Sequence, residues 1–244
     1  AKLSLQAFGP FQAAALRFAL AVVLLWLWAW VSGKRIEFPR SQASWFGIVG
    51  VAATGYGLLY PLQLAGLNRI PSGLSATIML GSPVLVVLLS SLAERSAVSG
   101  MKWFSVALGA LGGVIALLGQ GGFIGNPSGE HLLLGCALTL AAAFSLAIST
   151  VITKKALAGL DSLSLTFWTL LGGLLLLAPF SLAEGWPRVD SFSVALPAVL
   201  YLALAGSACG FLIWNRAIQL SEPRMLAATM HIKTPVALFI GAAL

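Results

Sequence analysis

The sequence predicts an all-α integral membrane protein. Of its 244 residues, 59% are hydrophobic and only 9% are charged, whereas about 25% of the residues in a soluble domain are charged. Apolar runs of about twenty residues recur along the chain, and each is long enough to cross a hydrocarbon core of about 30 Å as a helix. Strand patterns with alternating polarity are absent from the sequence, which argues against a transmembrane barrel.

Eight apolar stretches are expected to be membrane-spanning helices. Pro10 suits the first turn of the first helix, and Trp30 near the end of that helix is followed by Lys34, an arrangement typical of a membrane interface. Pro83 is expected to bend the third helix, because a mid-helix proline frees a backbone carbonyl. The expected spans are 11–31, 44–66, 71–92, 101–119, 131–153, 164–182, 195–216 and 223–244.

An internal repeat relates two of these spans. Residues 71–84 (PSGLSATIMLGSPV) and 223–236 (PRMLAATMHIKTPV) align at a constant offset of 152 (223 − 71), with 6 identities in 14 positions. Coincidental similarity between two apolar helices is the alternative. Two prolines twelve residues apart in both segments favour a duplication, and the expected loops coincide at the same offset.

The repeat predicts the organisation of a longer protein. Residues 1–119 would form a first repeat that lacks its first helix, and residues 131–244 a second repeat that is cut within its fourth helix. The Gly/Pro/Asn-rich stretch 120–130 would be the linker. The sequence starts without Met and stops inside an apolar run, so we interpret it as a fragment. The complete protein would have two five-helix repeats, inverted because five is odd, and ten helices.

The distribution of charge predicts the orientation. One set of loops carries nine cations, whereas the loops on the opposite side carry Lys2, Arg69 and Arg188. The positive-inside rule places the nine-cation side in the cytoplasm, so both termini of the ten-helix protein would be cytoplasmic. The nine are Lys34, Arg35, Arg40, Arg95, Lys102, Lys154, Lys155, Arg216 and Arg224.

Short motifs add a family resemblance. The sequence contains LRFALA at 16–21, SPV at 82–84, AER at 93–95 and TPV at 234–236. In this order, and with the repeat, they make the chain resemble the EamA-type family of the drug/metabolite transporter superfamily. The resemblance implies a ten-helix carrier of a bacterial-type inner membrane, commonly an exporter of amino acids or other small metabolites, sometimes driven by protons. Family members often have an acidic or neutral residue where this chain has Lys233.

Lys233 is the first candidate site residue. It lies about ten residues into its expected helix, hence about 15 Å deep, and a charge at that depth is costly. Its repeat partner is Gly81, so the scaffold does not require a cation there. The position predicts a site for a substrate carboxylate or for proton coupling; a snorkelling or ion-paired lysine is the alternative. His231 lies on a different face and could relay protons or pack between helices.

Other candidates are polar or aromatic residues within the spans. Tyr56 and Tyr60 share a helix face at i, i+4 and, with Trp168, could form an aromatic wall for a ligand; packing is the alternative. Arg17 could contact substrate, or it could cap a neighbouring helix end or meet lipid headgroups. Ser82, like Thr234 beside the second proline, could face substrate or bond a freed carbonyl.

Several classes of function are disfavoured. Asp161 and Asp190 both lie in expected loops and the chain has only two histidines, so no metal cluster, catalytic triad or cofactor motif can be assembled. Cys136 and Cys209 lie in apolar runs and are expected to pack as small hydrophobes. The net charge of +7 is scattered over short loops, which disfavours a nucleic-acid partner. We therefore expect no enzymatic activity and no cofactor.

Inverted repeats with a site near the midplane are a common plan for secondary transporters. The leading hypothesis is a carrier that exports a small amphipathic metabolite, such as an amino acid, by alternating access. A nucleotide-sugar or phosphorylated-metabolite exchanger of the same superfamily is the alternative within transport, and a membrane sensor or scaffold is the alternative outside it. The expected partners are the substrate, the lipid bilayer and possible coupling protons, for a monomer or homodimer.

Overall fold

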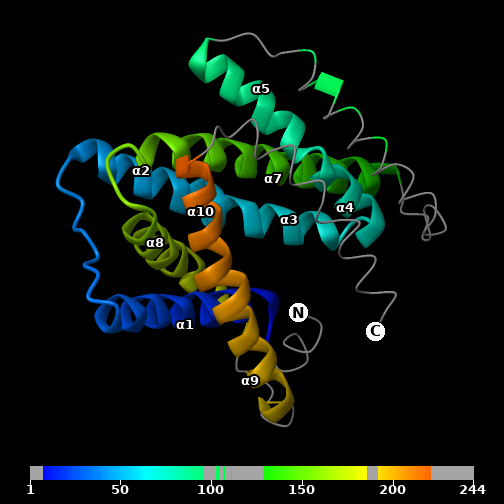
Figure 1. Ribbon diagram of the computed structural model, residues 1–244. Coiled ribbons are helices and arrows are strands. Elements are labelled where there is room, and N and C mark those ends of the chain that lie inside the picture. Colours follow the sequence, from blue (N-terminus) through cyan, green and yellow to red (C-terminus); the bar gives the residue numbers. More distant parts are fainter. Residues whose placement is uncertain are drawn as a thin grey trace. The chain divides into compact units, whose positions relative to one another are not determined.

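The computed structural model describes residues 8–95, 129–185 and 192–220, together with a few positions between 100 and 111 (Figure 1). Every regular element within these ranges is helical. Six helical segments among the described residues are long and apolar enough to cross a membrane, in agreement with six of the expected spans. They are Pro10–Val31, Gln42–Leu67, Gly73–Glu94, His131–Ala156, Ser162–Ala183 and Val199–Leu220. The expected spans 101–119 and 223–244 lie almost entirely outside the described residues.

The chain divides into two compact units, residues 1–57 with 152–220 and residues 58–151 with 221–244. The first unit has α8 as its central helix, in contact with α1, α2 and α10. Its described elements are α1 (Pro10–Val31), α2 (Gln42–Ala52), most of the π-helical η2 (Ala53–Leu58), α8 (Ser162–Ala183), α9 (Phe192–Tyr201), the π-helical η4 (Leu202–Cys209) and α10 (Gly210–Leu220).

Helices α1 and α8 pack antiparallel, as their ends show. The Glu184 carboxylate, which follows α8, accepts hydrogen bonds from the backbone N–H groups of Phe11 (3.1 Å) and Gln12 (2.8 Å) in the first turn of α1. At the other end, the backbone N–H of Glu37, beyond α1, donates to Ser164 Oγ in the first turn of α8 (2.8 Å). The Glu184 carboxylate also complements the positive end of the α1 helix dipole.

The bounds of these two helices agree with the repeat. Adding 152 to Pro10–Val31 gives 162–183, which are the bounds of α8, and both helices have 22 residues. Each start has its own local cause. Pro10 occupies the first turn of α1, as expected, whereas the Asp161 carboxylate caps α8 by accepting from the backbone N–H groups of Leu163 (3.2 Å) and Ser164 (3.1 Å).

Two π-helical segments interrupt the spans that were expected to be regular helices over 44–66 and 195–216. The segment η2 follows α2, and η4 follows α9. Shifted by 152, η2 becomes 205–210 and overlaps η4, which agrees with the predicted repeat. A π segment changes the direction of the side chains that follow it, and such segments are frequent at functional sites.

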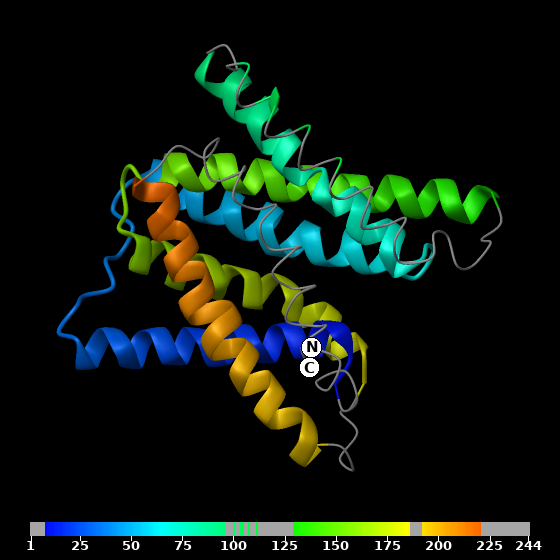
Figure 2. The same cartoon turned by 45° about the vertical axis from the view of Figure 1, so that its right-hand side comes forward.

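The second unit contains α3 (Leu59–Leu67), α4 (Ser72–Leu80), α5 (Ser82–Glu94) and most of α7 (Gly129–Ala156). Within it, α3 runs alongside α7 in both views (Figures 1 and 2), and Val86 and Val87 of α5 pack against Ala147 of α7. The helix expected over 71–92 is interrupted near Pro83: α4 ends at Leu80, and Pro83 lies in the first turn of α5.

Candidate functional site

The centre of the first unit is organised around Tyr56, a side chain of η2 that is 5% exposed. Its side chain lies near Thr169 of α8 and within electrostatic range of Arg17 of α1. Thr169 Oγ1 also donates to the carbonyl of Leu165 (2.8 Å). A cation, a phenol and a hydroxyl thus meet between three helical segments.

Aromatic rings surround this polar contact. The Tyr56 ring packs edge-to-face with Phe18 (centroids 5.0 Å apart) and with Phe211 of α10 (5.4 Å), while Phe18 and Phe211 are 6.4 Å apart. The guanidinium carbon of Arg17 lies 4.9 Å from the centroid of the Phe18 ring, within the range of a cation–π interaction. The arrangement places a cation beside aromatic rings in the interior of the first unit.

Gly173 makes the approach of Tyr56 to α8 possible. A Cβ atom on Gly173 would lie 2.9 Å from Cβ and ring atoms of Tyr56, closer than packed carbon atoms approach. One turn earlier than Thr169, Thr166 Oγ1 accepts a hydrogen bond from Asn215 Nδ2 of α10 (2.9 Å). The buried face of α8 therefore carries polar side chains over about two turns, and the hydroxyls of Thr166 and Thr169 take part in hydrogen bonds.

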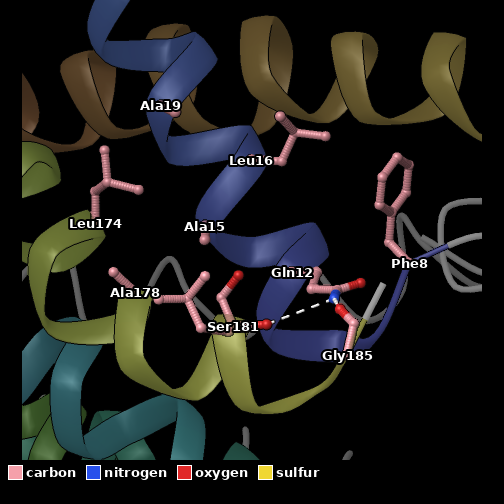
Figure 3. A pocket seen from close by; sticks show the side chains of 10 residues that line it. Phe8, Gln12, Ala15, Leu16, Ala19, Leu174, Ala178, Ser181 and Gly185 are labelled. Carbon is pink, nitrogen blue, oxygen red and sulfur yellow. Dashed lines mark hydrogen bonds between the residues drawn. The ribbon is translucent and has the colours of Figure 1, made fainter. Parts of the chain in front are cut away.

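A separate cavity of about 560 Å³ lies between the first half of α1 and the second half of α8. Figure 3 shows Leu16 of α1 and Leu174 and Ala178 of α8 around it, with the Gln12 side chain at one end. The amide nitrogen of Gln12 donates to the carbonyl of Ser181 (3.5 Å) and to that of Gly185. The cavity is thus apolar along its walls and polar at one end, as ligand pockets commonly are.

The predicted aromatic wall is divided in the structure. Trp168 packs edge-to-face with Trp45 (5.7 Å) and with Phe38 (5.4 Å), and its indole N–H donates to the Glu37 carbonyl (3.0 Å). Tyr56 belongs to the Phe18/Phe211 cluster instead, because Trp168 and Thr169 point to different faces of α8.

The remaining predicted site residues lie elsewhere. Tyr60, in α3, and Ser82, the first residue of α5, belong to the second unit; Tyr60 is partly buried and Ser82 is 5% exposed. Lys233, His231 and Thr234 lie outside the described residues. Of the predicted set, Arg17 and Tyr56 are the two that the structure brings together.

Sequence reasoning did not single out Thr169, Phe18 or Phe211. The predicted repeat could have identified Thr169, because Thr169 is the repeat partner of Arg17 at the offset of 152. No comparable signal marks the two phenylalanines, since an aromatic residue in a membrane helix is ordinary. Within the part of the chain that the structure describes, no three His, Cys, Asp or Glu side chains come together as a metal site would require.

Known proteins share this architecture. A crystal structure matches 94% of this chain, and 76% of its own, with a TM-score of 0.77 at 20% sequence identity, which shows the fold. An uncharacterized transporter of Archaeoglobus fulgidus is 27% identical over 95% of this chain and 78% of its own length. A probable terminal-alkyne amino-acid exporter of Streptantibioticus cattleyicolor is 26% identical over 78% of this chain, which spans 61% of that exporter.

The helical architecture, with segments long and apolar enough to span a membrane, and these relatives indicate an integral membrane protein of the transporter class. The model of the EamA-like transporter family matches residues 1–118 and residues 133–244. The chain therefore belongs to the EamA-like transporter family.

Proposed function

We propose that the complete protein is a secondary carrier that exports a small amphipathic metabolite, such as an amino acid, by alternating access. The observation that carries this proposal is the packing of Tyr56 between α1 and α8: its ring contacts Phe18, over which Arg17 lies, and it contacts α8 at Gly173, one turn from Thr169. Arg17 and Thr169 are repeat partners on antiparallel helices, so this cluster lies where an inverted duplication would have its axis. Carriers of this plan bind substrate at the interface of their repeats.

The chemistry of this centre suits a zwitterionic or carboxylate-bearing metabolite. Arg17 supplies a cation that can bind a carboxylate through two N–H groups, and the rings of Phe18, Tyr56 and Phe211 supply an apolar surface. In the low-dielectric core of a membrane, an arginine is costly unless it has a role or a partner. The name of the Streptantibioticus cattleyicolor relative, a probable amino-acid exporter, supports the same substrate class.

The rest of the proposal follows from the sequence. Two inverted five-helix repeats would place both termini in the cytoplasm of a bacterial-type inner membrane, in a monomer or homodimer. Lys233, with His231 and Thr234 nearby in sequence, would serve substrate binding or proton coupling from the second copy of the duplicated helix. Ser82 and Tyr60 would contribute from the first repeat. Lys233→Met would then abolish transport without loss of the folded protein.

Counterflow in proteoliposomes tests the proposal. The full-length protein is reconstituted with a high internal concentration of one unlabelled metabolite, and uptake of the labelled compound is followed. We expect transient accumulation for one or more amino acids and none for nucleotide sugars or phosphorylated metabolites. Accumulation of a nucleotide sugar alone would support an exchanger, and no flux of any compound would support a sensor or scaffold; either result would contradict the proposal.

A further inference from the structure

An apolar groove of about 370 Å³ runs between α2 and α8 in the first unit, separate from the Tyr56 centre. Aliphatic side chains form its length, including Ile48 and Val49 of α2 and Leu175 of α8. Trp45 and Trp168 close one end. A groove of this shape matches a flexible hydrocarbon chain better than a polar metabolite.

The residues beside the groove are as exposed as lipid-facing residues are. In α2, Phe46 is 76% exposed and Val49 is 57% exposed, and in α8 Leu175 is 66% exposed. Both helices belong to segments that are long and apolar enough to span a membrane. The first molecules that such a surface meets are lipid acyl chains.

The aromatic end of the groove is rigid. Trp45 and Trp168 pack edge-to-face (5.7 Å), and Phe38 closes a triangle with them at 5.6 Å and 5.4 Å. The indole N–H of Trp168 donates to the carbonyl of Glu37 (3.0 Å), which ties the ring to the loop after α1. Tryptophan favours the depth at which acyl chains meet headgroups, so this end of the groove marks the membrane interface.

The loop that contributes Phe38 is basic. Residues 34–40 (KRIEFPR) carry three cations against the one carboxylate of Glu37. Arg35 and Arg40 are both exposed, whereas Lys34 stacks over the Trp28 ring at 4.7 Å. An apolar groove below an interfacial loop with excess positive charge is complementary to a lipid with a negative headgroup.

The repeat does not explain these features. At the offset of 152, Trp45 corresponds to Pro197 and Trp168 to Leu16, so the equivalent positions carry no aromatic ring. The scaffold therefore does not require the tryptophan pair.

We propose that the groove between α2 and α8 is a binding site for one anionic phospholipid, with an acyl chain along Val49 and Leu175 and the phosphate at Arg35 and Arg40. This site is distinct from the proposed transport centre and does not depend on the proposed function. A phospholipid bound there would stabilise the packing of α2 against α8.

Native mass spectrometry of the full-length protein in detergent, titrated with dioleoylphosphatidylglycerol or dioleoylphosphatidylcholine, tests this site. We expect one phosphatidylglycerol to be retained more tightly than phosphatidylcholine. Arg35→Gln and Arg40→Gln should each weaken phosphatidylglycerol binding about fivefold, from the usual attraction of one basic residue to an anionic lipid. Val49→Trp fills the groove and should abolish retention of both lipids at this site.

Matched controls separate the groove from general effects. Phe46→Trp adds bulk to the same helix outside the groove, and Lys155→Gln removes an exposed cation from the last turn of α7; neither should change lipid retention. Equal retention of the two lipids, or retention by Val49→Trp equal to that of the wild type, would overturn the proposal. So would a change in oligomeric state or loss of folding in Val49→Trp, because the groove would then hold a second copy or another segment of this chain.

Discussion

Arg17 and Thr169 occupy the same position in the two copies of the repeat, 152 residues apart, and both lie near the side chain of Tyr56. Their helices, α1 and α8, have equivalent bounds and run antiparallel. One copy of the position carries a permanent charge and the other a hydroxyl. The proposed duplication would account for the location of the centre, and divergence between the two copies would account for its polarity.

The Tyr56 hydroxyl is expected to matter more for transport than for folding. Tyr56→Phe keeps the buried ring and removes the hydroxyl, and a hydrogen bond between membrane helices contributes about 0.6 kcal/mol to stability. We expect the counterflow rate to fall about tenfold, equivalent to about 1.4 kcal/mol. Tyr201→Phe, at a site 70% exposed, is the control. Equal rates for both variants would exclude the hydroxyl from the transport centre.

Gly173 is expected to tolerate no side chain. In Gly173→Ala the new methyl group would meet the Tyr56 ring at 2.9 Å, and overpacking of this kind costs about 1–3 kcal/mol. In Gly206→Ala the nearest neighbour, on Leu202, is 3.8 Å away, so no loss is expected. Thermal unfolding in detergent measures both. Equal melting temperatures would mean that Tyr56 is not held against α8.

Glu184 is expected to stabilise the start of α1 from the end of α8. Glu184→Ala removes two hydrogen bonds to backbone N–H groups and the charge near the helix terminus, a loss of about 1–2 kcal/mol. Glu37→Ala is the control, because the Glu37 contacts described above use backbone atoms. We expect Glu184→Ala to have a lower melting temperature than Glu37→Ala. The reverse order would contradict the role of Glu184 in stabilising α1.

The orientation can be tested by labelling single cysteines, with Cys136 and Cys209 replaced by alanine. Arg35→Cys lies in the basic loop after α1, Lys155→Cys lies in the last turn of α7, and Asn68→Cys lies in the turn after α3. A membrane-impermeant maleimide should label Asn68→Cys in intact cells, and the two basic positions only after permeabilisation. Labelling of Arg35→Cys or Lys155→Cys in intact cells would reverse the proposed orientation.

The spans were predictable because they depend on long apolar runs and on local helix signals. Prediction gave 11–31 and 164–182, and the structure has Pro10–Val31 and Ser162–Ala183; the small differences lie at Pro10 and at the Asp161 cap. The π segments were not predicted, because a one-residue change of register leaves no mark on an apolar sequence. The cap that Glu184 provides to α1 was hidden as well, since its partners lie about 170 residues away.

The candidate site was predictable only in part. Arg17 and Tyr56 are conspicuous because charge and phenol are rare in these spans, and both lie at the centre of the first unit. Whether Tyr56 lies beside Trp168 depends on the face of α8 from which Trp168 projects. The packing of α8 against α1 and α2 determines that face. Thr169 became recognisable only when the repeat was applied to Arg17.

Counterflow of a transported amino acid by Arg17→Gln, compared with Lys155→Gln in the same full-length protein, tests the central claim most directly. Because Thr169 occupies the equivalent position without a charge, the scaffold is expected to tolerate glutamine at position 17. We predict that Arg17→Gln remains folded in the membrane and loses counterflow, while Lys155→Gln transports at the wild-type rate. Wild-type counterflow by Arg17→Gln would contradict the assignment of this centre as the transport site.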